Sequence, residues 1–121
     1  MAHTIDPFNR ATHQFDTIKV ARTFTERLQG LLVFKEHPHQ LVYVIPRCKI
    51  VHTFGMSYPI DIIFINRSLS IVHINEHVAA NEICLSLEAA HTLELQAGAI
   101  REHNIKLGDR LCAEQFSNIS N

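Results

Sequence analysis

The sequence has few glycines, few cysteines and no excess of charge of either sign. Eleven Lys and Arg residues against twelve Asp and Glu residues give 121 residues a formal net charge of −1. A surface with this balance has no strong positive field to attract nucleic acid or acidic lipid. The four glycines are scattered and form no phosphate-binding loop, and no Gly-x-Ser-x-Gly hydrolase motif occurs. We therefore expect no nucleic-acid partner and no nucleotide-binding loop.

Long apolar segments and paired cysteines are also absent. The longest nearly unbroken apolar stretch, residues 59–65, is too short to cross a bilayer, so we expect no membrane partner. Residues 1–7 lack the basic and apolar regions of a secretory signal peptide. Cys48, Cys84 and Cys112 form no Cys-x-x-Cys pair, which argues against a disulfide framework and a thiolate zinc site. These features predict free thiols in a reducing, cytoplasmic setting.

The apolar fraction of 46% and the charged fraction of 19% are ordinary for a globular protein. At this length there is room for one domain. Residues 1–14 mix polar residues and proline without a period, so we interpret them as an N-terminal arm without regular structure. Residues 15–121 are expected to form a single β domain.

Short runs of alternating or continuous apolar residues predict strands over residues 15–21, 41–45, 48–54, 60–65, 70–77, 92–96 and 110–116. A Thr-x-x-Glu capping box at residues 23–26 predicts a short helix over 24–29, and Gly98 begins a helical turn. Residues 78–90 are compatible with either helix or loop. The predicted fold class is mainly β: an antiparallel β-sandwich or distorted barrel with one or two short helices.

Asp61 stands in the strand predicted over 60–65, whose other residues are apolar on both faces, as in a central strand. A buried carboxylate needs an ion pair, a proton or hydrogen-bond donors. Arg27, Arg47 and His52 are the candidate partners. Asp61 is then either a structural carboxylate that accepts backbone N–H bonds, or a general base or ligand-binding group.

His52 lies in the strand predicted over 48–54, on the face that also carries Ile50. It is either a core histidine or a member of a polar site. If loop 55–59 closes a hairpin, this strand pairs with the strand of Asp61, and the two polar side chains lie close together. On this basis we expect Asp61→Asn to weaken ligand binding more than it lowers stability.

Glu94 stands on the face opposite to its apolar neighbours in the strand over 92–96. It is either a solvent-facing residue or the second carboxylate of an acid/base site with Asp61. Phe54, Met56 and Tyr58 give the neighbouring loop a soft apolar character, typical either of an adaptable binding surface or of a lid folded onto the core.

Nine histidines are present, but their spacing does not indicate a metal site. His73 and His77 share a strand face, where two residues four apart are separated by about 13 Å, too far for one ion. No His-Glu-x-x-His motif occurs. We therefore expect neither a metal nor another cofactor, and interpret most histidines as titratable surface groups.

Three ordered segments carry a resemblance to a known family. Residues 23–32 read Thr-x-x-Glu-Arg-x-x-Gly-Leu-Leu, and residues 48–65 read Cys-x-x-x-His-Thr-Phe-Gly-Met-x-x-Pro-Ile-Asp-x-x-Phe-Ile. Residues 93–98 and 105–109 read Leu-Glu-Leu-x-Ala-Gly and Ile-x-x-Gly-Asp. Together they resemble domain-of-unknown-function family 192, an uncharacterised bacterial and archaeal family. The resemblance implies a mostly β fold and an activity that is not established. Many relatives carry an export signal, which residues 1–7 do not resemble.

Three functions remain open from the sequence. The first is a ligand-binding or accessory module with a pocket around His52 and Asp61, taking a small molecule or a peptide. The second is an acid/base, hydrolase-like enzyme that uses Asp61 with His52 or Glu94. The third is a protein-interaction module that docks through residues 54–58. We expect a monomer or weak dimer, and the predicted ligand-binding residues are Arg27, His52, Phe54, Met56, Asp61 and Glu94.

Overall fold

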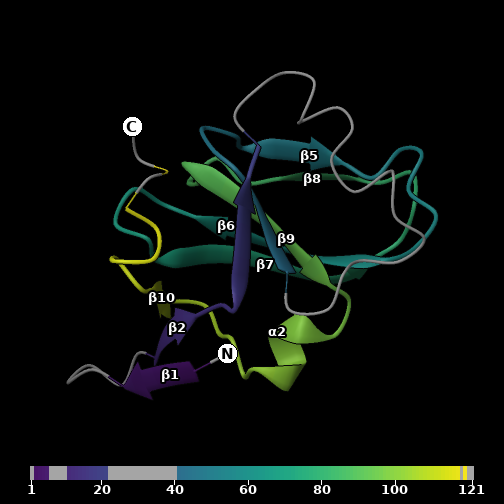
Figure 1. Ribbon diagram of the computed structural model, residues 1–121. Coiled ribbons are helices and arrows are strands. Elements are labelled where there is room, and N and C mark those ends of the chain that lie inside the picture. Colours follow the sequence, from purple (N-terminus) through teal and green to yellow (C-terminus); the bar gives the residue numbers. More distant parts are fainter. Residues whose placement is uncertain (1, 6–10, 22–40, 118, 120–121) are drawn as a thin grey trace.

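The structure is a computed structural model that describes residues 2–5, 11–21, 41–117 and 119. Its elements in chain order are β1 (Ala2–Ile5), β2 (Ala11–Gln14), β3 (Thr17–Val20), β4 (Leu41–Ile45), β5 (Ile50–His52), β6 (Ile60–Ile65), β7 (Ile71–Val78), β8 (Ile83–Leu85), β9 (His91–Gln96), α2 (Ala99–Glu102) and β10 (Arg110–Leu111) (Figure 1). The helix predicted over 24–29, and with it Arg27, lies outside the described residues.

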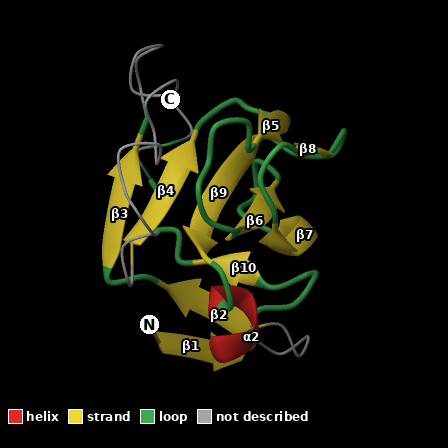
Figure 2. Ribbon diagram, turned by 90° about the vertical axis from the view of Figure 1, so that its right-hand side faces the viewer, coloured by secondary structure: helices red, strands yellow, loops and turns green. Residues whose placement is uncertain are grey.

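A five-stranded sheet in the order β3-β4-β9-β6-β7 forms the centre of the molecule (Figure 2). All six residues of β6 are buried between β9 and β7, as the apolar run over 60–65 predicted. The expected mainly β fold is confirmed. β3 nevertheless runs parallel to β4, while the other neighbouring pairs are antiparallel. The long connection over residues 21–40 permits this, because parallel neighbours need a crossover rather than a tight turn.

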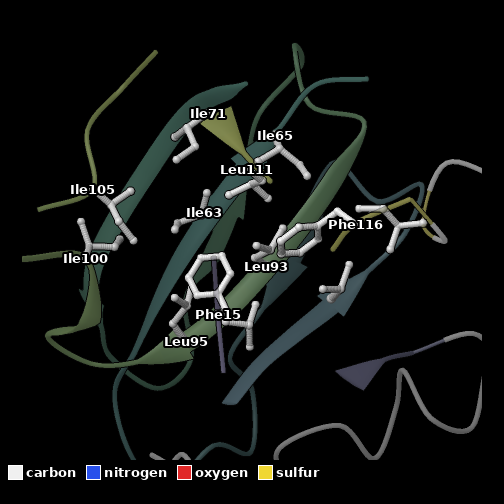
Figure 3. Packing of buried hydrophobic residues seen from close by; sticks show 13 residues of the cluster. Phe15, Ile63, Ile65, Ile71, Leu93, Leu95, Ile100, Ile105, Leu111 and Phe116 are labelled. Atoms are coloured by element: carbon white, nitrogen blue, oxygen red, sulfur yellow. The ribbon is translucent and has the colours of Figure 1, made fainter. Parts of the chain in front are cut away.

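Smaller elements cover the two faces of this central sheet. On one face lie β2 with the residue that follows it, α2, β10 and the segment after β10, which contribute Phe15, Ile100, Leu111 and Phe116 to a first core (Figure 3). On the other face lies the two-stranded sheet of β5 and β8 (Figure 1). It contributes Val51 and Cys84 to a second core, which also contains Tyr43, Ile62 and Phe64 of the central sheet. The central sheet therefore separates two apolar layers, and a residue's position in the strand alternation decides which layer it enters.

The hairpin that would bring the strand of His52 next to the strand of Asp61 does not form. β5 pairs with β8, through Val51 opposite Cys84, and β6 pairs with β7 and β9. Residues 53–59 therefore cross from the small sheet to the central sheet instead of turning back on β5. The sequence left residues 78–90 undecided between helix and loop, and this is the stretch that supplies β8, the true partner of β5.

Three local expectations also need correction. The arm expected to lack regular structure contains β1 and β2, and β2 pairs in parallel with β10. The strand predicted over 110–116 ends at Leu111, after which the amides of Gln115 and Phe116 donate to the Cys112 carbonyl in a tight turn. On β5 the alternation is present, but Val51 is the buried residue, while Ile50 and His52 are exposed. Both faces of β5 carry apolar residues, so alternation alone could not identify the inner face.

Candidate functional site

Asp61 is fully buried, with 0% of its surface exposed. One carboxylate oxygen accepts the His77 amide at 2.8 Å. The other accepts the amides of Gly98 at 3.1 Å and Ile100 at 2.9 Å. Two of these donors have left-handed backbone conformations, with φ of 50° at His77 and 95° at Gly98, so the chain is bent where its N–H groups meet the carboxylate. Asp61 therefore joins β6 to β7 and to the start of α2, the structural alternative that the sequence left open.

His52 lies on the exposed face of β5, in the two-stranded sheet. Its ring stacks on Phe54, with centroids 4.8 Å apart and planes 27° apart. Its Nδ1 atom accepts the Phe54 amide at 3.2 Å. β5 covers the second-core face of the central sheet, whereas Asp61 bonds to α2 on the first-core face. The structure therefore does not bring His52 and Asp61 together.

Glu94 occupies the middle of β9, opposite Tyr43 of β4 and Ile62 of β6. Strand alternation directs its side chain into the second core, and only 8% of its surface is exposed. Burial raises the pKa of Glu94 from 4.5 to about 7. The expectation of a solvent-facing Glu94 is therefore wrong, because β9 is an inner strand and the small sheet covers this face. A carboxyl group with this pKa exists in both protonation states near neutral pH.

Tyr58 is a neighbour of Glu94 that the sequence named only as a loop aromatic. It is buried in the second core, and burial together with the Glu94 charge raises its pKa to about 12. Met56 is partly buried against the same core. We call Tyr43, Met56, Tyr58 and Glu94 the Glu94 cluster. Within it, two of the predicted ligand-binding residues, Met56 and Glu94, border the same core.

The loop over residues 53–59 is anchored at Thr53. The Thr53 hydroxyl donates to the Ala79 carbonyl at 2.6 Å and accepts the Glu82 amide at 2.9 Å. From this anchor Phe54 points outward with 48% of its surface exposed, whereas Tyr58 is buried. Phe54, Met56 and Tyr58 therefore do not form one exposed patch. The loop instead covers the second core with one side and presents Phe54 with the other.

A larger apolar surface lies on the outward face of the small sheet. Ile50 of β5 is opposite Leu85 of β8, and both are more than half exposed. Ile83, Leu87 and Phe54 are also exposed nearby along the same two segments. We call these five residues the outer apolar face. Clustered apolar side chains of this kind are typical of interaction surfaces.

Two histidines, His13 and His91, are buried, although no pattern in the sequence distinguishes them from the histidines expected at the surface. The Nε2 atom of His13 lies 2.8 Å from an Asp109 carboxylate oxygen, and both side chains are buried. Asp109 also accepts the amides of Ala11 and Lys106, so it ties β2 to the turn before β10. His91 is buried at the start of β9, where its Nδ1 atom accepts the Arg47 amide at 3.0 Å. Asp109 belongs to the Ile-x-x-Gly-Asp motif over residues 105–109. Its partner His13 is 96 residues away in the sequence, so no local pattern could predict that the two are paired.

The part of the chain that the structure describes contains no group of three or more His, Cys, Asp or Glu side chains placed to share a metal ion. It also contains no helix of the length and apolarity needed to span a bilayer. Arg27, the remaining predicted ligand-binding residue, lies outside the described residues, and its role stays a prediction.

The fold and the site define a mainly β module with a structural carboxylate on one face of its central sheet and a titratable carboxyl group on the other. The sequence profile of family DUF192, described as "Uncharacterized ACR", matches residues 7–113, and the chain belongs to this family. It is 30% identical over 96 residues to the UPF0127 protein TK1120 of Thermococcus kodakarensis, a match that covers 76% of this chain and 61% of the relative. The chain thus spans about three fifths of the length of that curated relative.

Two solved structures share the fold. One is a protein of Sinorhizobium meliloti 1021, provisionally named a transcription regulator, with a TM-score of 0.74 and 24% identity over 89% of this chain and 88% of that one. The other is a protein of unknown function from Novosphingobium aromaticivorans, with a TM-score of 0.70 and 19% identity over 91% of each chain. At these identities the likeness concerns the architecture alone.

Proposed function

We propose that this protein is a ligand-binding module whose site is the Glu94 cluster, beneath the loop over residues 53–59. The observation that carries the proposal is a carboxyl group buried in the middle of the central sheet, beside a buried phenol, with a pKa of about 7. Buried groups whose protonation state is balanced near neutral pH are concentrated at functional sites. Asp61 and His52 are left out of this site, because Asp61 is used by backbone amides and His52 faces outward.

The chemistry of Glu94 favours a ligand that carries N–H donors, such as an amine or an amide. In a poorly hydrated setting a hydrogen bond to an ionised carboxylate is stronger than in water. A ligand with positive charge or good donors would therefore stabilise the ionised form and release a proton on binding. Met56 at the edge of the second core offers adaptable apolar contact for the rest of the ligand.

If the protein is instead an acid/base enzyme, Glu94 is the carboxyl group suited to proton transfer. Asp61 and Glu94 extend into opposite faces of the central sheet, so they do not form a two-carboxylate site. A carboxyl group with a pKa near 7 is suited to proton transfer, but the ligand-binding function needs no further partner residue.

A thermal-shift screen against amine- and amide-containing metabolites tests the proposal. We expect ligands that raise the melting temperature of the wild type to lose this effect in Glu94→Gln, which keeps the shape of the side chain but not its charge. Glu76→Gln, at an exposed position of β7, is the matched control and should respond like the wild type. Ligands that stabilise wild type and Glu94→Gln equally would overturn the proposal.

Protein interaction is a second candidate function, favoured by the outer apolar face. We propose that this face docks an apolar surface of another protein, and a second copy of the chain is the first partner to test. Sedimentation at increasing concentration should show weak dimers that Leu85→Glu disperses. Leu107→Glu changes an exposed leucine outside the outer apolar face and should leave dimers intact. A monomer at every concentration, or dimers unaffected by Leu85→Glu, would reject self-association.

We also propose that the protein works in a reducing, cytoplasmic setting. The three cysteines of the described residues are free thiols, which supports this proposal.

A further inference from the structure

A basic hollow lies at the end of the central sheet where β4 and β6 end and β9 begins. Its volume is about 1030 Å³. It is lined by Arg47 and Lys49 after β4, by residues 66–68 between β6 and β7, and by residues 88–91 at the start of β9. This volume lies just above the usual range for small-molecule sites, about 300–1,000 Å³. Neither the Glu94 cluster nor the outer apolar face contributes to this lining.

Hydrogen bonds from backbone and side-chain donors hold the three lining segments together. The Ala90 amide donates to the Ile65 carbonyl at 2.7 Å, and the Cys48 amide donates to the Ala90 carbonyl at 3.1 Å. The Thr92 hydroxyl donates to the Cys48 carbonyl at 2.8 Å. The ammonium group of Lys49 donates to the Ala89 carbonyl at 2.6 Å. The hollow is therefore built on the hydrogen-bonded ends of strands, which fixes the relative positions of its lining segments.

The charges in this lining are predominantly positive. Arg47, Lys49 and Arg67 are cationic, while Glu88 is the acidic residue among the described lining residues. The chain as a whole has a formal net charge of −1. The excess of positive charge in the hollow is therefore a local feature and not a consequence of the overall composition. Because field lines concentrate in a concave surface, grouped cations there attract anions more strongly than the same charges on a flat surface.

Two further groups supply uncharged donors. The side-chain oxygen of Asn66 accepts the amides of Ser68 at 2.9 Å and Ser70 at 3.0 Å, which orients its amide so that the nitrogen is the donor that remains. His91 accepts the Arg47 amide at Nδ1, so its neutral ring carries the proton on Nε2. Burial, with the charges of Arg47 and Arg67, lowers the pKa of His91 and keeps the ring neutral at pH 7.

We propose that this hollow binds a small organic phosphate, with the Arg47 and Arg67 guanidinium groups on the phosphoryl oxygens and Asn66 and His91 donating beside them. Guanidinium groups match phosphate in geometry and can bond it in a bidentate manner. The hollow is larger than a phosphoryl group, so the organic part of the ligand also has room within it. The proposal does not depend on the Glu94 cluster and assigns a second, separate ligand to the module.

NMR titration of the ¹⁵N-labelled full chain with inorganic phosphate and then with pyrophosphate tests this site. We expect saturable shifts of the amides of residues 66–68 and of His91, with tighter binding of pyrophosphate. Arg67→Gln should weaken binding about tenfold, the loss expected for one charged hydrogen-bonding group. Arg67 is exposed in a turn, so the spectrum of this variant should otherwise match the wild type. Arg101→Gln, on α2 and outside the hollow, is the matched control.

Arg67→Lys keeps the charge but not the planar fork, and we expect binding between that of the wild type and that of Arg67→Gln. Sodium chloride at equal ionic strength distinguishes a phosphate site from general screening of cations. Shifts that do not saturate, that chloride reproduces, or that persist unchanged in Arg67→Gln would overturn the proposal.

Discussion

Asp61 and Glu94 are both buried carboxylic acids on neighbouring strands of the central sheet, and their surroundings differ. Asp61 on the first-core face accepts three backbone amides from β7 and the start of α2. Glu94 on the second-core face has a pKa raised to about 7 by the loss of water around it. Burial of a carboxyl group therefore does not by itself indicate function. Asp61 is a hydrogen-bond acceptor that connects three elements, whereas the two protonation states of Glu94 are balanced near neutral pH.

The difference follows from what covers each face. The first-core face is covered near Asp61 by α2 and by the turn before it, whose first N–H groups have no acceptor within the helix. The second-core face is covered by the small sheet, which contributes the apolar side chains of Val51 and Cys84. The same sheet thus has one carboxylate that holds the fold together and one acid whose charge the fold disfavours.

The largest expected effect is at Asp61. Asp61→Ala removes the acceptor of the His77, Gly98 and Ile100 amides, the last of which is buried, and should lower the free energy of unfolding by about 4 kcal/mol. Urea denaturation at pH 7 measures the loss, and Glu76→Ala on exposed β7 should cost about 0.5 kcal/mol or less. Asp61→Asn should fall between them, because one oxygen remains as an acceptor. A loss below about 1 kcal/mol for Asp61→Ala would mean that these amides have another acceptor, and would remove the contrast with Glu94.

The sequence alone led us to expect that Asp61→Asn weakens ligand binding more than it lowers stability. From the hydrogen bonds of Asp61 we now expect this substitution to lower stability more than it affects ligand binding. The sequence showed that Asp61 needed partners, because a charge in a continuous apolar strand has no other explanation. It could not identify them, because Gly98 and Ile100 lie 37 and 39 residues away. The central strand over 60–65 and the turn at Gly98 were predicted correctly, since both depend on local pattern.

The features that the sequence missed depend on pairing between distant segments. β8 has three residues, and without it neither the partner of β5 nor the inner face of β5 could be assigned. Glu94 alternates with leucines as a surface residue would, and only the inner position of β9 shows that both faces are buried. Arg27 and its capping box lie outside the described residues, so that part of the predicted site stays a prediction.

A smaller effect is expected from Glu94 through pH. The group titrates near 4.5 when unfolded and near 7 when folded. Between these values the folded state binds more protons, so the free energy of unfolding falls as pH rises, by up to about 3 kcal/mol in total. Glu94→Gln should remove this fall: the two proteins should be similar at pH 4, and the variant more stable at pH 8.

The measurement is urea denaturation of wild type and Glu94→Gln across that pH range. Taking their difference cancels the opposite contributions of His91 and His103, whose pKa values are lowered. Glu76→Gln should keep the wild-type slope. If Glu94→Gln keeps it as well, the charge of Glu94 is stabilised within the second core, and the contrast between the two carboxylates is lost.

The smallest effects come from the sheet that covers Glu94. Val51 is buried on the inner face of β5 and Ile50 is exposed on the outer face. Val51→Ala should lower the free energy of unfolding by about 2 kcal/mol, and Ile50→Ala by about 0.5 kcal/mol or less. The smaller side chain also loosens the packing of the small sheet and lets water approach Glu94. Val51→Ala should therefore shift the pKa of Glu94 back toward 4.5. The ¹³C resonance of the Glu94 carboxyl group measures this pKa. Ile50→Ala should leave that resonance unchanged. Equal pKa values in both variants would show that the small sheet does not cause the shift, and that the source lies elsewhere around the second core.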